Sequence, residues 1–172
     1  MLVTVTVPAS TSNLGPGYDS LGMALSLKAK FTFEPADTLV IEGCPEAYRN
    51  ADNLVMQGFR TVCEKAGRSA PAVRLVIDSE VPVARGLGSS STCIAGGMAA
   101  ANAMLGSPFT TDELFQLCTA FEGHPDNAAP AFFGGLTASF MHEGKAVAVP
   151  FRPDPAWRFA AVIPNYEVRT EE

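Results

Sequence analysis

Apolar and polar residues alternate in several short stretches of the chain, and this period of two predicts β-strands. Leu2–Val7 is the first stretch, and Pro8 is expected to end it. Ala24–Phe33 alternates in the same way, so that its apolar residues share one face, and Thr38–Glu42 and Ala72–Asp78 are shorter examples. Three later stretches are predicted to be closing strands: "GGLTASF", "KAVAVPF" and "RFAAVIP".

Helical spacing appears between these strands. In "ADNLVMQGFRTVCEKAG" the apolar residues recur every three or four positions, with Asp52 or Asn53 able to cap the start and Gly67 the end. A second helix is predicted from about Thr111 to Phe121, and a short one through "AAPAFF". Because several strands are adjacent in sequence while helices separate others, the pattern predicts an α+β domain rather than a strictly alternating α/β one.

Composition supports one folded domain. The chain has 172 residues, of which 47% are hydrophobic and 17% charged, enough apolar material for a real core. The net charge of −6, with few and scattered basic residues, argues against a nucleic-acid partner. The N-terminus does not have the pattern of a signal peptide, and the longest run of small residues is too short to span a membrane.

The four cysteines do not suggest a metal site or a disulfide framework. They form no CxxC pair, and neither histidine lies at metal-ligand spacing from them. We therefore expect free thiols in a reducing, cytoplasmic setting. The cysteines are Cys44, Cys63, Cys93 and Cys118.

The turn "PVARGLGSSST" is the first candidate for chemistry. It follows a predicted strand and precedes a run of small residues that reads as a buried helix, with Ser89–Ser91 placed to cap that helix. Gly86 and Gly88 permit a positive φ or a close backbone approach, and the N–H groups at a helix start bind anions such as phosphate. The turn is not a Walker A loop, since no Lys follows Gly88. An ordinary serine-capped turn explains this segment alone equally well.

Two polar clusters favour the functional interpretation. The first is Pro8–Gly22, in which residues 9–22 are predicted to be a loop, and the second is Glu122–Gly135, which begins "EGHPDN". Each residue of the second cluster has an ordinary explanation on its own, such as a solvated charge for Glu122 or a helix cap for Asp126 or Asn127. Capping does not explain the whole set.

Together the three segments resemble the GHMP small-molecule kinases, and within them most closely the homoserine kinase branch. The likeness rests on "VPASTSNLGPGYDSLGMAL", "PVARGLGSSS" and "EGHPDNAAPAFFGG", in this order along nearly the whole chain. It implies a domain like the second domain of ribosomal protein S5, with a left-handed βαβ unit. It also implies Mg²⁺- and ATP-dependent phosphorylation of the L-homoserine hydroxyl, giving O-phospho-L-homoserine in threonine biosynthesis. A homodimer is one assembly that the resemblance allows.

The resemblance also implies site residues. Ser90 and Glu122 would hold Mg²⁺, and Asn53 would lie near the adenine. Asp126 and Asn127 would be catalytic, with Asp126 either a base or an orienting group. The ATP phosphates would be wrapped by Pro82, Val83, Ala84, Arg85, Gly86, Leu87, Gly88, Ser89, Ser90, Ser91 and Thr92. Homoserine would be bound by Asn13, Asp19, His124, Asp126 and Asn127.

One departure from the family pattern concerns the end of the chain. Homoserine kinases continue through a segment of the pattern Ser-Thr-x-x-Ala-Arg, whereas here "PNYEVRTEE" has Arg169 in place of the serine and stops at Glu172. We therefore expect residues 1–163 to form the N-terminal, ATP-binding domain and residues 164–172 to begin a connection to a C-terminal domain. Two alternatives stay open: another GHMP kinase, and a non-catalytic nucleotide-binding fragment.

Overall fold

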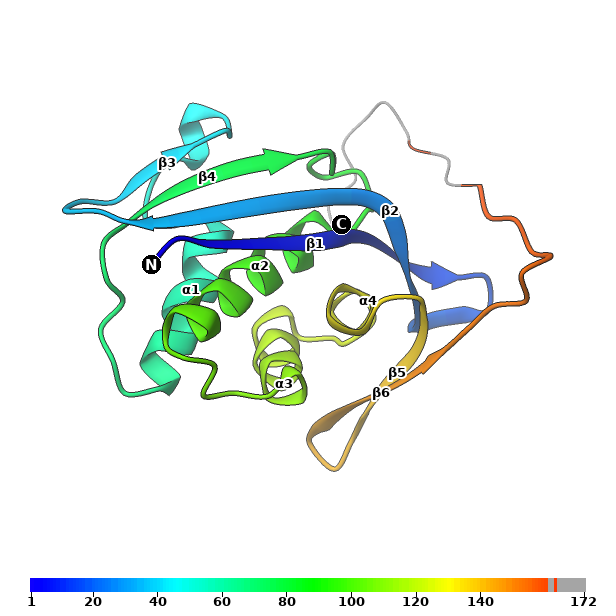
Figure 1. The fold of residues 1–172 in the computed structure, drawn as a ribbon. Coiled ribbons are helices and arrows are strands. Elements are labelled where there is room, and N and C mark those ends of the chain that lie inside the picture. Colours follow the sequence, from blue (N-terminus) through cyan, green and yellow to red (C-terminus); the bar gives the residue numbers. More distant parts are fainter. Residues whose placement is uncertain (161–162, 164–172) are drawn as a thin grey trace.

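A computed structural model describes residues 1–160 and residue 163, and its sheet is built around one long strand. This strand, β2 (Gly17–Pro35), pairs antiparallel with β1 (Val3–Leu14) along nearly its whole length. The later part of β2 also pairs with β4 (Val73–Ser79), and its early part pairs with β5 (Leu136–His142). The strand β2 therefore joins two halves of one sheet (Figure 1).

The outer strands complete the sheet at both ends. At one end β3 (Val40–Glu42) pairs parallel with β4, and at the other β6 (Lys145–Phe151) pairs antiparallel with β5. The short 3₁₀ helix η1 (Glu46–Tyr48) and helix α1 (Leu54–Lys65) connect β3 to β4. This parallel pair with its helix is a βαβ unit, as the predicted fold class requires.

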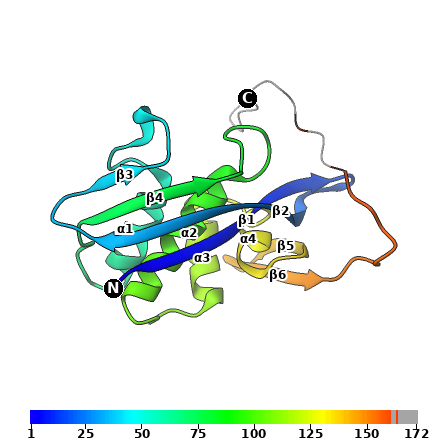
Figure 2. The same ribbon diagram turned by 45° about the horizontal axis from the view of Figure 1, so that its top comes forward.

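The helices lie together on one side of the sheet (Figures 1 and 2). Helix α2 (Ser89–Met104) runs beneath β1 and β2 and packs on the three others, which are α1, α3 (Thr111–Glu122) and α4 (Ala128–Phe133). None of the helices in the described part is long and apolar enough to cross a membrane.

Small residues let α2 occupy this central place. A Cβ atom added at Gly97 would lie 1.9 Å from the carbonyl oxygen of Val55 in α1, and one at Gly96 would lie 2.4 Å from the Phe31 ring of β2. Helix α2 therefore approaches another helix on one side and the sheet on the other, closer than any side chain permits. Glycine costs helix stability, and this double contact explains why two are present.

Most predicted elements are confirmed, and the hydrophobic core follows from them. Asn53 caps α1, since its side-chain oxygen accepts a hydrogen bond of 2.9 Å from the Val55 N–H. Alternate residues of β2, Phe31 and Phe33, are fully buried against the helices, and the Phe33 ring stacks on Phe59 of α1 at 5.2 Å.

Three predictions about local structure were wrong. Pro8 does not end the first strand: β1 passes through it with a shift of register between Pro8 and Ser10, where the missing N–H is tolerated. For the same reason the segment 9–22, predicted to be a loop, forms the closing end of the β1–β2 hairpin instead. The second wrong prediction is the cap of α2. The residue at that position is Gly88, with a φ of 62°, and the three serines predicted to cap the helix lie inside its first turn.

The third wrong prediction is the last closing strand. Residues 158–160 and 163 of "RFAAVIP" are not in a strand, and the rest of that stretch lies outside the described residues. The segment 164–172, expected to begin a connection, also lies outside them.

Candidate active site

The turn before α2 has a backbone of alternating handedness. Ala84, Gly86 and Gly88 have positive φ values of 54°, 70° and 62°, whereas Arg85 and Leu87 between them do not. Alternation of this kind turns successive N–H groups toward one side and forms concave sites for anions. The first turn of α2 follows directly, and its N–H groups add the positive end of a helix dipole.

A cavity of about 640 Å³ opens over this turn. Its walls come from four segments that are distant in sequence: the end of β1, the turn with the start of α2, the end of α3, and the residues that lead into α4. Its lining residues are Ser12, Ala84, Arg85, Gly86, Leu87, Gly88, Ser89, Ser90, Ser91, Phe121, Glu122, His124 and Asn127. The structure thus brings together most of the predicted phosphate-binding residues with three from the "EGHPDN" cluster.

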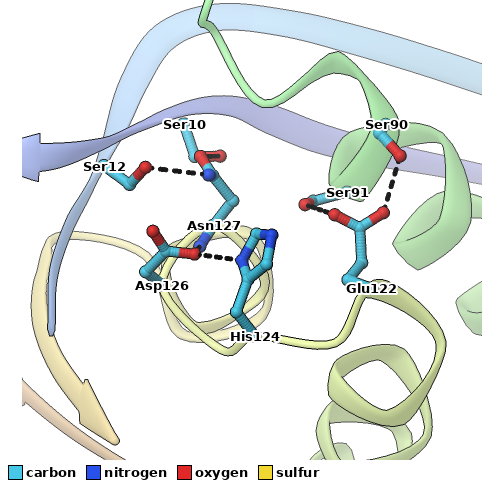
Figure 3. Close-up of polar contacts among 8 residues, drawn as sticks. All are labelled: Ser10, Ser12, Ser90, Ser91, Glu122, His124, Asp126 and Asn127. Carbon is cyan, nitrogen blue, oxygen red and sulfur yellow. Dashed lines mark hydrogen bonds and ion pairs between the residues drawn. The ribbon is translucent and has the colours of Figure 1, made fainter. Parts of the chain in front are cut away.

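Glu122 is held at the edge of this cavity by two consecutive serines. The hydroxyl of Ser90 donates to one carboxylate oxygen and that of Ser91 to the other, both at 2.6 Å (Figure 3). Ser91 is buried and Ser90 is half-buried. A carboxylate beside a hydroxyl is an oxygen donor set of the kind that hard cations take, so Ser90 and Glu122 fit a Mg²⁺ ion that a bound nucleotide would bring. Among the described residues no group of three His, Cys, Asp or Glu side chains could hold a metal alone.

Asp126 lies beneath the cavity rather than in its lining. Its carboxyl group is 2% exposed, and one oxygen contacts His124 Nδ1 at 2.5 Å while accepting a hydrogen bond of 2.9 Å from the Asn127 N–H. The carboxylate thereby orients the ring of His124, which does line the cavity. Figure 3 shows this ring between the carboxylate of Asp126 and that of Glu122.

The side chain of Asn127 is fixed at both ends by β1. Its oxygen accepts a hydrogen bond of 2.9 Å from the Ser10 hydroxyl, and its nitrogen donates one of 3.0 Å to the Ser12 hydroxyl. Sequence reasoning missed both serines because it treated residues 9–22 as a loop. Their spacing of two is the signal that could have identified them, since i and i+2 in a strand share a face.

A second, smaller cavity of about 260 Å³ adjoins the first through Ser89, which lines both. Its other walls are largely apolar and include Tyr48, Val83 and Cys93. Asn53 lies here too, but its nitrogen donates to the Tyr48 carbonyl at 2.8 Å and its oxygen caps α1. Burial raises the pKa of the Cys93 thiol to about 12, so this thiol adds no negative charge to the wall of the smaller cavity near pH 7.

Besides Val83, Asn53 and Asp126, three predicted residues with described side chains do not line the large cavity. Thr92 is buried and donates to the carbonyls of Pro8 and Gly88, at 3.1 and 2.9 Å, which ties α2 to β1. Pro82 borders neither cavity. Asp19 is an exposed residue of β2 with φ 52° and does not line either cavity. Asn13 is in β1, and its side chain lies outside the described part of the structure.

Comparison with known proteins identifies relatives of this fold. Residues 53–135 match the family described as the GHMP kinases N terminal domain. The homoserine kinase of Clostridium beijerinckii is 42% identical over 173 residues, which cover 99% of this chain and 58% of that protein.

Two solved structures share the fold. The homoserine kinase of Cytophaga hutchinsonii superposes with a TM-score of 0.79 at 24% identity, over 99% of this chain and 58% of that one. The mevalonate kinase of Methanococcus jannaschii gives a TM-score of 0.68 at 14% identity, over 88% and 56%. The chain spans about 58% of the length of the curated relatives it matches. Sequence match and fold agree in likening this chain to the N-terminal domain of the GHMP kinases, whose fold it has.

Proposed function

We propose that this chain binds ATP with Mg²⁺ and takes part in phosphorylating the side-chain hydroxyl of L-homoserine. The product would be O-phospho-L-homoserine, an intermediate of threonine biosynthesis. The proposal rests on the 42% identity to a homoserine kinase and on the arrangement of groups around the larger cavity.

The ATP phosphates would bind in the turn formed by residues 84–88 and the first turn of α2. The alternating backbone there supplies N–H donors, which suits a chain that has few basic side chains. The smaller cavity supports a place for the adenine, since it is largely apolar and shares Ser89 with the phosphate site. Asn53 would then border the base while its amide keeps its capping role.

The metal would be held by Ser90 and Glu122. When bound, Mg²⁺ neutralises charge on the phosphate oxygens and orients them for transfer. Ser91 would keep the second Glu122 oxygen in place, because its hydroxyl is already bonded to that oxygen. The residues of this chain contribute position and charge rather than a covalent step.

The acceptor would lie on the other side of the cavity, among Ser12, His124 and Asn127. Asp126 would act by orienting His124 and the Asn127 backbone, since the buried carboxylate lies outside the cavity lining. The homoserine hydroxyl would attack the γ-phosphorus as the bond to the ADP oxygen breaks, and the hydroxyl proton would be lost to solvent or to a neighbouring base. Asn13 and Asp19, which lie in the β1–β2 hairpin, stay predictions as homoserine-binding residues.

The observation that carries this proposal is the shared cavity: one wall suits phosphates and a metal, and the facing wall carries the polar groups of the "EGHPDN" cluster. A coupled assay of ADP release tests it, with L-homoserine compared with L-serine and L-threonine at equal concentrations. Binding of ATP analogues and of homoserine is measured in parallel. We expect homoserine to bind and to be the preferred acceptor. Equal rates of ADP release with all three amino acids would contradict the assignment. So would a homoserine that neither binds nor stimulates ADP release.

The setting of the reaction is also part of the proposal. The free cysteines fit a reducing compartment such as the cytoplasm. Residues 1–163 would form the ATP-binding domain, and homodimerisation stays a prediction.

A further inference from the structure

Ser10 occupies the point where three parts of the site meet. It is fully buried in β1, where its N–H donates to the Leu87 carbonyl of the phosphate turn at 3.2 Å. Its hydroxyl donates to the Asn127 side chain at the start of α4, at 2.9 Å. A Cβ atom added at Gly88 would lie 2.1 Å from the same hydroxyl, so the turn also packs directly on it. One small residue thus links β1, the turn and α4.

The direction of these bonds decides what Asn127 can offer to the cavity. A side-chain amide has one oxygen and an NH₂ group with two donors. The oxygen of Asn127 is bonded to Ser10, and one donor is bonded to Ser12. One N–H donor and one lone pair of the oxygen are not used by these two bonds, and Asn127 lines the cavity. Without the Ser10 hydroxyl the amide would be bonded to β1 at one end only, through Ser12, and could turn about its side-chain bonds.

We propose that Ser10 is a positioning residue that fixes the side-chain amide of Asn127 at the edge of the cavity and holds it in register with the phosphate turn. Its effect on phosphoryl transfer rests on the proposed function, whereas the orientation of the amide does not. A bound phosphate oxygen or hydroxyl on the acceptor side would then meet a fixed donor. Such a group stabilises charge without reorganising as the reaction proceeds.

The test compares Ser10→Ala with Ser139→Ala as the matched control. Ser139 is equally buried, but its hydroxyl has no hydrogen-bond partner within the described residues, so the control removes the same atom without breaking a bond. Proton–nitrogen NMR spectra follow the side-chain NH₂ signals of Asn127, which are assigned by their loss in Asn127→Ala. We expect Ser10→Ala to shift or double the Asn127 pair and to shift the amide signals of residues 86–88. Ser139→Ala should leave both unchanged.

Ser10→Cys is the second variant, because its similar volume preserves packing at this buried position while a thiol is a weak donor. It should likewise shift or double the Asn127 pair, and it provides the test if Ser10→Ala does not fold. Unchanged Asn127 signals in a folded Ser10 variant would overturn the proposal.

A double-mutant cycle gives the functional readout. If wild-type protein transfers phosphate to homoserine, Ser10→Ala should lower kcat about tenfold, as expected for one buried hydrogen bond, with a smaller change in KM. In an Asn127→Ala background the same substitution should have little further effect. Equal losses in both backgrounds would show that Ser10 does not act through Asn127. Absence of homoserine phosphorylation by wild-type protein would count against the proposed function, and the NMR result would still decide the role of Ser10.

Discussion

The carboxylate of Glu122, the last residue of α3, accepts a 2.6 Å hydrogen bond from the hydroxyl of Ser90 in the first turn of α2. The two residues are 32 positions apart, and the bond closes one side of the larger cavity. If this pair holds the metal of a bound nucleotide, the negative charge of Glu122 should contribute to nucleotide binding mainly when the metal is present.

Glu122→Gln keeps the shape of the side chain and removes its charge. We expect it to weaken binding of an ATP analogue in the presence of Mg²⁺ by about tenfold or more, with a much smaller effect in EDTA, because a neutral amide is a poorer ligand for a hard cation. Calorimetric titrations with and without Mg²⁺ measure the difference.

The control is Glu64→Gln, the same change at an exposed position of α1. It should bind the nucleotide like the wild type under both conditions. A loss of equal size with and without metal in Glu122→Gln would assign this carboxylate a structural role instead.

Gly88→Ala tests the packing of the phosphate turn on Ser10. The substitution should cost about 1 kcal/mol from the left-handed backbone conformation. In addition, its Cβ would lie 2.1 Å from the Ser10 hydroxyl oxygen and 2.9 Å from the Asn127 side-chain oxygen. We therefore expect both lower stability and about tenfold weaker nucleotide binding. Gly67→Ala is the comparison, since Gly67 has a φ of 68° with open space around it, and should lose stability only. Wild-type nucleotide affinity in folded Gly88→Ala would argue against this packing.

Gly97→Ala tests the close contact between α2 and α1. Alanine favours a helix over glycine, but here its methyl group would lie 1.9 Å from the Val55 carbonyl oxygen, which the backbone cannot move without shifting α1. We expect a loss of about 2 kcal/mol in the free energy of unfolding, measured by urea denaturation. Gly96→Ala should cost less, because the group it meets is the Phe31 side chain rather than the backbone of another helix. A stabilised Gly97→Ala would mean that the helices are further apart than described.

The capping box of α3 predicts a pH dependence. Hydrogen bonds from the Thr110 N–H and hydroxyl lower the pKa of Glu113 from its ordinary value of 4.5. A carboxyl group whose pKa is lowered by folding stabilises the fold above its unfolded pKa, and this contribution is lost as the pH falls through the folded pKa. Glu113→Gln should therefore be less stable than wild type near pH 7, and the difference should shrink as the pH falls below 4.5 and through the lowered pKa of the folded state. Urea denaturation at several pH values checks this, and a difference that does not change with pH would contradict it.

Much of the fold could be predicted because its strands and helices follow simple periodicity. The alternation at Phe31 and Phe33 and the cap at Asn53 are local signals, and both are confirmed. Pro8 misled the prediction because a proline usually breaks pairing, whereas β1 absorbs it with a shift of register that depends on β2. Serines are common helix caps, but Gly88 takes this place because its left-handed backbone continues the alternation of the turn.

The site could be predicted only in part for a similar reason. The residues on the turn and in "EGHPDN" have distinctive chemistry, and the structure brings most of them to one cavity. Ser10 and Ser12 have no such distinction in sequence. Their spacing of two places them on one face of a strand, but their contact with Asn127 depends on the pairing of β1 with β2 and on the approach of α4.

Binding of nucleotide at the turn can be observed directly by titrating the isotopically labelled chain with Mg²⁺ and a non-hydrolysable ATP analogue. Backbone amide signals are followed by proton–nitrogen NMR. We expect saturable shifts that are largest at residues 84–91, with further shifts at residues 122–127, because both segments border the same cavity. No saturable change, or shifts confined to segments away from residues 84–91, would contradict the assignment of this turn as the phosphate site.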